Sequence, residues 1–400
     1  MSSAYVFYSS IKRIKTKSKE INRLKSVLPL PNYHVFIAFA DGHWVLHDTL
    51  KDQLIKEGVV QGDASKYLVL IKSPKALDKN TIIYTNCSMF KLQALNPYTG
   101  EHDQNWQQDA PTLEGLPEAD RTNESKVDKA YTGFEIEVLR KSRVVGVQER
   151  KENTQGFFDY FITVYAEGQK ERLLQVTHNA QGKQMKFKNG NDEDTFIFYS
   201  TTQYESFQIC VLNINEREKG LQNVTINTRM DCTLFNLYPW GDKTIALFGN
   251  PDANGTPLQV IHKLGTDKVD IITMDCHYQN KKTILNNVLA ADPVKKRVLL
   301  KESSNPPTVA VWNSAYNRVE FAREQPNTRD CAGSLDGTYF VEFDRNLRGE
   351  KEETKITVNR LVSKKMFILH FMKHAKLPSG RTFMEFHGSS DILKDVAGMI

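Results

Sequence analysis

Histidine and aspartate side chains crowd near the start of the chain, where their types could hold a metal ion or move protons. Asp41, His43, His47 and Asp48 lie within eight residues. The segment is typical of a hairpin that turns at Asp41 and Gly42, which puts the two histidines on one strand face. Imidazole and carboxylate groups bind Zn²⁺, but polar residues on an exposed strand face give the same pattern. We therefore assign no metal and no cofactor to this cluster.

Other catalytic patterns are weak. The sequence contains no phosphate-binding G-x-x-x-x-G-K-[ST] loop, no G-x-S-x-G elbow and no G-x-G-x-x-G turn. Cys276 and His277 are neighbours, and adjacent side chains on a strand point to opposite faces, so they cannot act as a nucleophile and its base. The sequence predicts a protein that is not an enzyme and has no small-molecule substrate.

The strongest binding signal is a basic stretch at the N-terminus. Residues 1–27 contain seven basic side chains against Glu20 alone, a net charge of +6. Because the whole chain carries +5, the remaining residues carry −1. The candidate residues for binding a nucleic acid or another anionic partner are Lys12, Arg13, Lys15, Lys17, Lys19, Arg23 and Lys25.

The apolar residues of this stretch recur at helical spacing. Ile11, Ile14, Ile21, Leu24 and Leu28 predict an amphipathic helix over residues 10–26. Proline cannot continue a helix, so Pro29 and Pro31 should end it. We expect an arm over residues 1–32 that can be removed from a folded body over 33–400. Three alternatives stay open: a helix packed on the body, an arm that binds RNA or an anionic membrane, and a mitochondrial presequence.

A repeat unit organises the C-terminal part of the body. Between Asn286 and Asp344, short apolar strands alternate with turns at Asp292-Pro293 and Asp336-Gly337, which lie 44 positions apart. Such strands are too small to bury their own faces. Their recurrence predicts an array of small antiparallel sheets that stack on one another.

Two segments of this unit resemble known repeats. TVAVWNS, which ends at Trp312-Asn313-Ser314, is similar to the end of a WD repeat, with Asn313 where the family has Asp. GSLDGTYFVEF resembles the turn between two inner strands of such a blade. The resemblance over about residues 286–344 implies a divergent β-propeller, a fold that hosts many functions.

The rest of the chain fits the same architecture. Residues 101–130 are polar and acidic and predict an exposed insertion, and LKDQLIKEG over 50–58 predicts a short helix. Residues 33–377 number 345, and without this 30-residue insertion they give 315, enough for seven units of about 45. We predict an all-β propeller, with seven four-stranded blades preferred over six or eight, and short N- and C-terminal helices.

Composition limits the location of the protein. No apolar run approaches the roughly 20 residues that a membrane-spanning helix needs. Five dispersed cysteines indicate reduced thiols and a cytoplasmic or nuclear setting. We expect a scaffold in a multiprotein complex that binds other proteins through the propeller rims, with its basic arm on a second partner. The alternatives are an RNA- or ribosome-associated factor and a propeller that binds anionic membranes.

Overall fold

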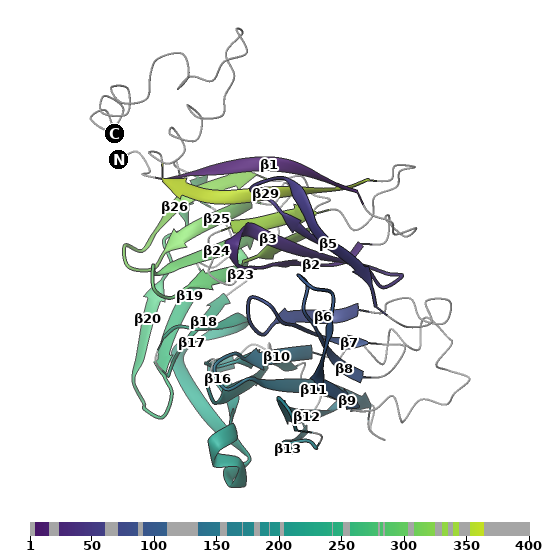
Figure 1. Cartoon of the computed structure of the whole chain (residues 1–400). Helices are drawn as coiled ribbons and strands as arrows, with labels where there is room; N and C mark the ends of the chain where they lie inside the picture. Colours follow the sequence, from purple (N-terminus) through teal and green to yellow (C-terminus); the bar gives the residue numbers. More distant parts are fainter. Residues whose placement is uncertain are drawn as a thin grey trace.

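The chain folds as seven four-stranded antiparallel blades that follow one another around a ring, as a computed structural model shows (Figure 1). This arrangement confirms the predicted all-β propeller and its blade number. The structure describes residues 5–15, 24–60, 71–86, 91–109, 135–152, 158–169, 171–179, 185–191, 193–200, 204–241, 243–250, 257–278, 281–282, 285–302, 308–324, 330–334, 339–343 and 353–363.

The first three blades each use four consecutive strands, from the innermost to the outermost. Blade 1 contains β2 (Leu24–Pro29), β3 (His34–Phe39), β4 (His43–Asp48) and β5 (Gln53–Val59). Blade 2 contains β6 (Ile71–Ala76), β7 (Ile82–Asn86), β8 (Lys91–Leu95) and β9 (His102–Asp109). Blade 3 contains β10 (Glu135–Leu139), β11 (Val144–Glu152), β12 (Phe158–Ala166) and β13 (Leu174–Asn179).

Blades 4 and 5 share one long strand, whose first half is the outer strand of blade 4 and whose second half is the inner strand of blade 5. That strand is β17 (Leu221–Pro239). Blade 4 also contains β14 (Met185–Asn189), β15 (Thr195–Ser200) and β16 (Tyr204–Asn213). Blade 5 also contains β18 (Thr244–Asn250), β19 (Leu258–Lys263) and β20 (Val269–Thr273).

The last two blades differ in how the chain builds them. Blade 6 is continuous and contains β23 (Leu285–Asp292), β24 (Arg297–Glu302), β25 (Thr308–Asn313) and β26 (Arg318–Glu324). Blade 7 contains β27 (Asp330–Gly333), β28 (Tyr339–Phe343), β29 (Glu353–Ser363) and, from the other end of the chain, β1 (Tyr5–Lys15). A two-stranded ribbon of β21 (His277–Tyr278) and β22 (Lys281–Lys282) precedes blade 6.

The ring closes where the two ends of the described chain pair. β1 and β29 lie side by side as the outer strands of blade 7 (Figure 1). The inner strands of neighbouring blades contact one another all the way round, including β27 of blade 7 against β2 of blade 1. The Tyr339 hydroxyl adds a link across this junction, 2.5 Å from the Leu30 carbonyl oxygen and 2.7 Å from that of His34.

The apolar core is divided among the blade interfaces. Seven clusters of buried residues are found in the described part of the chain, each between one pair of neighbouring blades. Strands in the middle of a blade face two neighbours, so they are apolar on both faces, as β25 shows with every residue buried. This explains the near-continuous apolar runs of the sequence. Trp312 of β25 is fully buried between blades 5 and 6.

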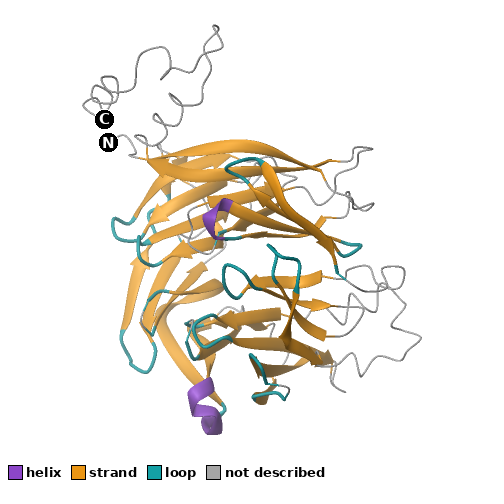
Figure 2. Cartoon of the chain, viewed as in Figure 1, coloured by secondary structure: helices purple, strands orange, loops and turns teal. Residues whose placement is uncertain are grey.

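Two predicted helices are corrected. The helix over residues 10–26 is wrong, because Tyr5–Lys15 and Leu24–Pro29 are strands. The helix over 50–58 is wrong as well, since Gln53–Val59 forms β5. In the described residues the helical segments are the 3₁₀ turns η1 (Pro31–Tyr33) and η3 (Ile214–Lys219), and strands dominate the molecule (Figure 2). The predicted C-terminal helix lies outside the described residues.

The first part of the predicted insertion is a strand. Residues 102–109 of the acidic segment form β9, the outer strand of blade 2, and Trp106 is fully buried against blade 3. An outer strand contacts a neighbouring strand on one edge only and buries few side chains. The sequence of β9 is therefore polar apart from Trp106 and has the composition of a loop. Residues 110–130 lie outside the described part of the chain.

Candidate functional site

The predicted binding residues that the structure describes lie on strands of two different blades. The structure describes four of the seven: Lys12, Arg13, Lys15 and Lys25. Lys17, Lys19 and Arg23 lie outside the described residues. The first three are on β1 in blade 7, whereas Lys25 is on β2 in blade 1. The basic residues therefore do not share one helical face.

Alternation along β1 separates its buried and exposed side chains. Ile14 points into the core between blades 7 and 1 and is 1% exposed, whereas Ile11 is 63% exposed. Positions three apart share a helix face but lie on opposite strand faces, which is why the helical pattern failed. Arg13 and Lys15 are exposed, and Lys12 lies on the inward side with its Nζ 3.4 Å from Oδ2 of Asp52.

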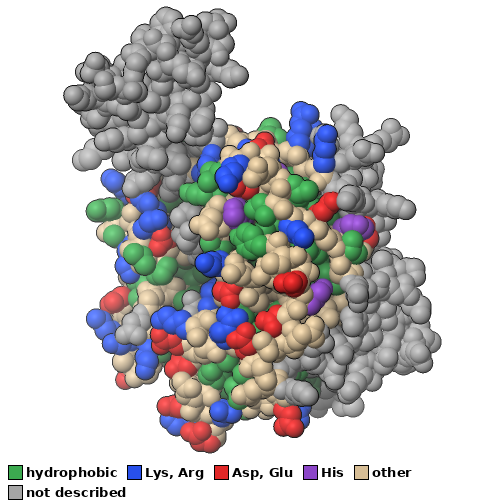
Figure 3. All heavy atoms as spheres, in the orientation of Figure 1, with side chains coloured by type: hydrophobic (Ala, Val, Ile, Leu, Met, Phe, Trp, Pro, Cys, Tyr) green, Lys and Arg blue, Asp and Glu red, His purple; other side chains and the backbone are tan. Residues whose placement is uncertain are grey.

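A basic strip, which we define as Arg13, Lys15 and Lys355, runs along the outside of blade 7. The strand register places Arg13 directly opposite Lys355 and Lys15 opposite Glu353. Figure 3 shows basic side chains along the top of the molecule, where Figure 1 places β1 and β29. Like charges directly opposite each other destabilise an antiparallel pair. No carboxylate within the described residues forms an ion pair with Arg13 or Lys355.

A second exposed feature is the rim formed by turns between first and second strands and between third and fourth strands, which we call the turn rim. Asp or Asn side chains close several of these turns. The Asp48 carboxylate accepts from the backbone N–H groups of Leu50 and Lys51, and Asp292 accepts in the same way from Val294 and Lys295. Such turns fix the backbone without a helix or ladder.

These turns hold apolar side chains out into solvent. Val294 is 88% exposed and Leu50, at the same position of its turn, is 50% exposed. Tyr316, on the other turn of blade 6, is 69% exposed and lies under the Arg318 guanidinium. Val294 and Tyr316 share the turn rim of one blade, and the Ser314 N–H donates to the Lys296 carbonyl between the two turns.

Ionic side chains from three inner strands meet near the axis of the ring. The Nζ atoms of Lys75 on β6 and Lys188 on β14 each lie 3.0 Å from Oε1 of Glu137 on β10. The Glu137 side chain is 8% exposed, and the two lysine side chains are 31% and 29% exposed. One carboxylate therefore bridges blades 2, 3 and 4.

The pKa values follow from burial and mutual attraction. Burial alone would raise the pKa of Glu137, but Lys188 and Lys75 outweigh it and lower that pKa to about 2. The Glu137 charge raises the pKa of Lys188 above its ordinary value, against burial. Burial lowers the pKa of Lys75, opposed by Glu137 and reinforced by Lys188. Glu137 and Lys188 are thus ionised at neutral pH, and their main effect is to hold the inner strands together.

This axial cluster was missed in the sequence, although a signal was present. FEIEV and MKFKN place charged residues two positions apart on strands that are otherwise apolar. Each pattern alone is typical of a half-exposed strand. Only the ring brings Glu137 next to Lys75 and Lys188, which are 62 and 51 positions away.

The histidine and aspartate cluster near residue 41 separates into pairs. His43 Nδ1 lies 2.8 Å from Asp41 Oδ2, and His47 Nε2 lies 3.1 Å from Asp52 Oδ1. No group of three or more His, Cys, Asp or Glu side chains that could hold a metal ion occurs among the residues the structure describes.

Comparisons with known proteins identify a fold and no family. No protein-family profile matches the chain, and no curated protein matches it. One similar solved structure is Kuenenia stuttgartiensis hydrazine synthase, with a TM-score of 0.54 and 13% sequence identity over 87% of this chain and 97% of that chain. At this identity the likeness shows the propeller fold alone. Of what the WD-repeat resemblance implies, the seven-bladed propeller arrangement is shown.

The same comparison corrects the prediction that the protein is not an enzyme. That prediction rested on missing motifs. The similar structure is named as an enzyme, hydrazine synthase, and this finding overturns the prediction. The fold by itself does not establish a reaction for this chain.

No helix in the described part of the chain has the length and apolar character needed to cross a bilayer.

Proposed function

We propose that this chain serves as an interaction platform in a cytosolic or nuclear multiprotein complex, with its turn rim as the main protein-binding surface. The observation that carries the proposal is the pair of side chains Val294 and Tyr316, 88% and 69% exposed on ordered turns of one blade. Exposed apolar and aromatic residues on rigid loops are characteristic of protein-binding surfaces. A turn already held by Asp292 or Asn313 loses little entropy when a partner binds.

The test is a pull-down from native lysate with a rim variant, Val294→Ser with Tyr316→Ser. The matched control is Leu54→Ser with Val59→Ser, which changes two residues 46% and 55% exposed on the outer strand of blade 1, away from the two turns of blade 6. We expect the rim variant to lose a partner that the parent and the control retain. Identical partner sets for all three proteins would refute the proposal.

A second candidate function is binding of RNA phosphates by the basic strip, favoured by Arg13 standing opposite Lys355. A phosphate between them would relieve the repulsion of the two cations. The binding constant for a single-stranded RNA should then fall with salt, with a slope of log K against log[salt] of about −0.7 per phosphate contacted.

The variant Arg13→Gln, Lys15→Gln, Lys355→Gln should lose most of this slope. The control Lys79→Gln, Arg172→Gln, Arg217→Gln removes the same charge from exposed positions elsewhere and should retain it. If both variants bind RNA as the parent does, the strip is not an RNA site. Loss of binding to anionic vesicles, with RNA binding unchanged, would assign the strip to a membrane surface.

A further inference from the structure

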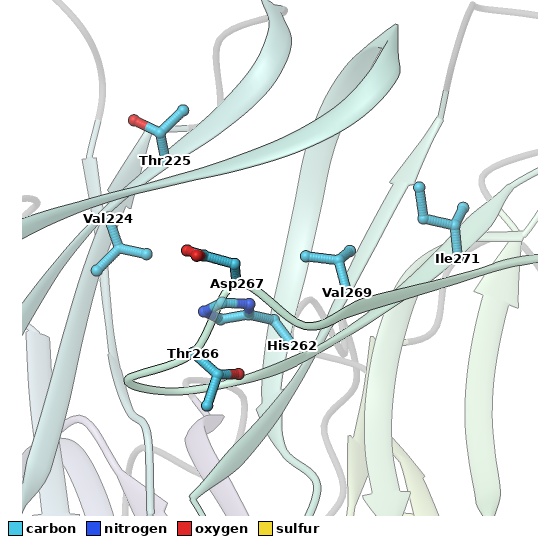
Figure 4. A pocket seen from close by; sticks show the side chains of 7 residues that line it. All are labelled: Val224, Thr225, His262, Thr266, Asp267, Val269 and Ile271. Carbon is cyan, nitrogen blue, oxygen red and sulfur yellow. The ribbon is translucent and has the colours of Figure 1, made fainter.

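A groove lies between the outer parts of blades 4 and 5. It includes the β19–β20 turn of the turn rim but lies on other blades than Val294, Tyr316 and the basic strip. Its volume is about 580 Å³, within the range of ligand sites. Val224 of β17 forms one wall and Val269 and Ile271 of β20 form the other (Figure 4). The remaining lining residues are Thr225, His262, Thr266 and Asp267.

His262 is the unusual member of this lining. It lies on β19 and is 2% exposed, and its ring nitrogens have no hydrogen-bond partner of ordinary geometry in the described structure, although the ring lies near the Lys268 backbone. Burial lowers its pKa, against smaller raising effects of the Lys268 backbone and the Asp267 carboxylate. At neutral pH the ring is therefore uncharged, with one nitrogen free to accept a hydrogen bond. Buried polar groups without partners are costly and uncommon.

The charge and shape of the groove restrict what fits in front of His262. Asp267 is the charged residue among those lining the groove, and its carboxylate points into the same space as the imidazole (Figure 4). Lys263 and Lys268 flank the turn but do not line the groove. A carboxylate and a neutral imidazole both accept hydrogen bonds from a cation, and the valine and isoleucine walls suit the methylenes of a long side chain.

We propose that this groove binds a lysine or arginine side chain of a partner polypeptide, with the cationic head at His262 and Asp267 and its stem between Val224 and Val269. The choice of a polypeptide as the occupant rests on the proposed role as an interaction platform. Ile271, which lines the groove and is 38% exposed, then packs against an apolar neighbour of the basic residue. This site selects positive charge, whereas the basic strip selects negative charge.

The test uses fluorescein-labelled peptides of sequence Gly-Ser-Val-Leu-X-Ile-Val-Ser-Gly, with X as arginine, lysine, citrulline or glutamate, and the full-length protein. Fluorescence polarisation should show binding of the arginine and lysine peptides, with citrulline at least about tenfold weaker and glutamate weaker still. Citrulline keeps the shape of arginine and removes its charge. Equal binding of the arginine and citrulline peptides, or no binding of any peptide up to about 1 mM, would overturn the proposal.

Variants locate the interaction. Asp267→Asn should reduce arginine-peptide affinity about tenfold, to the level of citrulline, while Lys268→Gln on the same turn should not reduce it. His262→Leu should weaken binding of the lysine and arginine peptides, and the unfolding temperature of this variant is measured alongside. Asp267 is exposed, so Asp267→Asn should fold and keeps the test valid if His262→Leu does not fold. An Asp267→Asn protein that binds as the parent does refutes the site. The rim variant should bind these peptides normally, so failure of the groove and failure of the rim give different results.

Discussion

Blades 6 and 7 are built from the same kind of strands but from different parts of the chain. Blade 6 uses one continuous segment from Leu285 to Glu324. Blade 7 joins β27, β28 and β29 to β1, so that the side chain of Ser9 donates a hydrogen bond to Asn359, 350 positions away. A continuous blade can form from strands that are neighbours in sequence. Blade 7 is complete only when β1, at one end of the chain, pairs with β29 at the other. The difference makes blade 7 the closure of the fold and blade 6 a self-contained unit.

The largest effect should come from removing β1. Deletion of residues 1–15 strips the outer strand from β29, removes its ladder and takes Ile14 out of the core between blades 7 and 1. We expect a loss in the free energy of unfolding of about 5 kcal/mol or more, measured by urea denaturation. This reverses the expectation that the N-terminal stretch can be removed from a folded body. A truncated protein as stable as the parent would show that β1 does not close the ring.

Within blade 6, the largest effect should come from Trp312. Its ring is fully buried in the cluster shared with blade 5. Trp312→Ala should leave a cavity and lower the free energy of unfolding by about 3–5 kcal/mol. Trp312→Phe, which retains an aromatic ring, should lose less. A loss below about 1 kcal/mol for the alanine variant would contradict the assignment of Trp312 to the core.

The difference between the continuous blade 6 and the composite blade 7 also decides what could be predicted from the sequence. The apolar run of β25 and the turn at Asp292 interact with neighbours within about 45 residues, so local pattern and spacing suffice to predict blade 6 and the propeller. In β1, Ile11 and Ile14 lie three positions apart, which is a helical spacing. No nearby sequence shows that the partner strand of β1 is β29. The axial cluster and the groove at His262 could not be predicted from the sequence for the same reason, because each brings together strands of different blades.

Ile14 and Ile11 give a sharper test of the strand assignment in blade 7. Ile14→Ala should cost about 2–4 kcal/mol, because the side chain is 1% exposed in the core. The same change at Ile11, which is 63% exposed, should stay within about 0.5 kcal/mol. A helix packed on the body through its apolar face would make the two losses similar. Equal effects in thermal and urea unfolding would therefore contradict the alternation on β1.

The axial cluster links distant segments through ionic side chains instead of strand pairing. Its removal should lower the free energy of unfolding by less than the loss of β1 does. Glu137→Gln leaves Lys75 and Lys188 without their shared carboxylate, and we expect a loss of about 1–3 kcal/mol, moderated by the partial exposure of both lysines.

The pH dependence of stability isolates this effect. The pKa of Glu137 is lowered from its ordinary value of 4.5 to about 2, so its contribution is present above pH 4.5 and is lost as the pH falls toward 2. The parent should lose stability across this window more steeply than Glu137→Gln. Parallel curves for the two proteins would mean that Glu137 titrates normally.

The smallest effect concerns the residue in blade 6 that departs from the WD pattern. Asn313 Oδ1 accepts from the Ala315 and Tyr316 N–H groups, and its Nδ2 donates to Glu320 Oε1 at 3.0 Å. An aspartate would retain the two acceptor bonds but would place a second carboxylate against Glu320, which already pairs with Arg297. Asn313→Asp should therefore destabilise the protein by about 1 kcal/mol near neutral pH, even though it introduces the aspartate of the WD pattern. Combining it with Glu320→Gln, whose side-chain amide can donate to the introduced carboxylate, should recover much of the loss. A more stable single variant would show that the local network does not select asparagine.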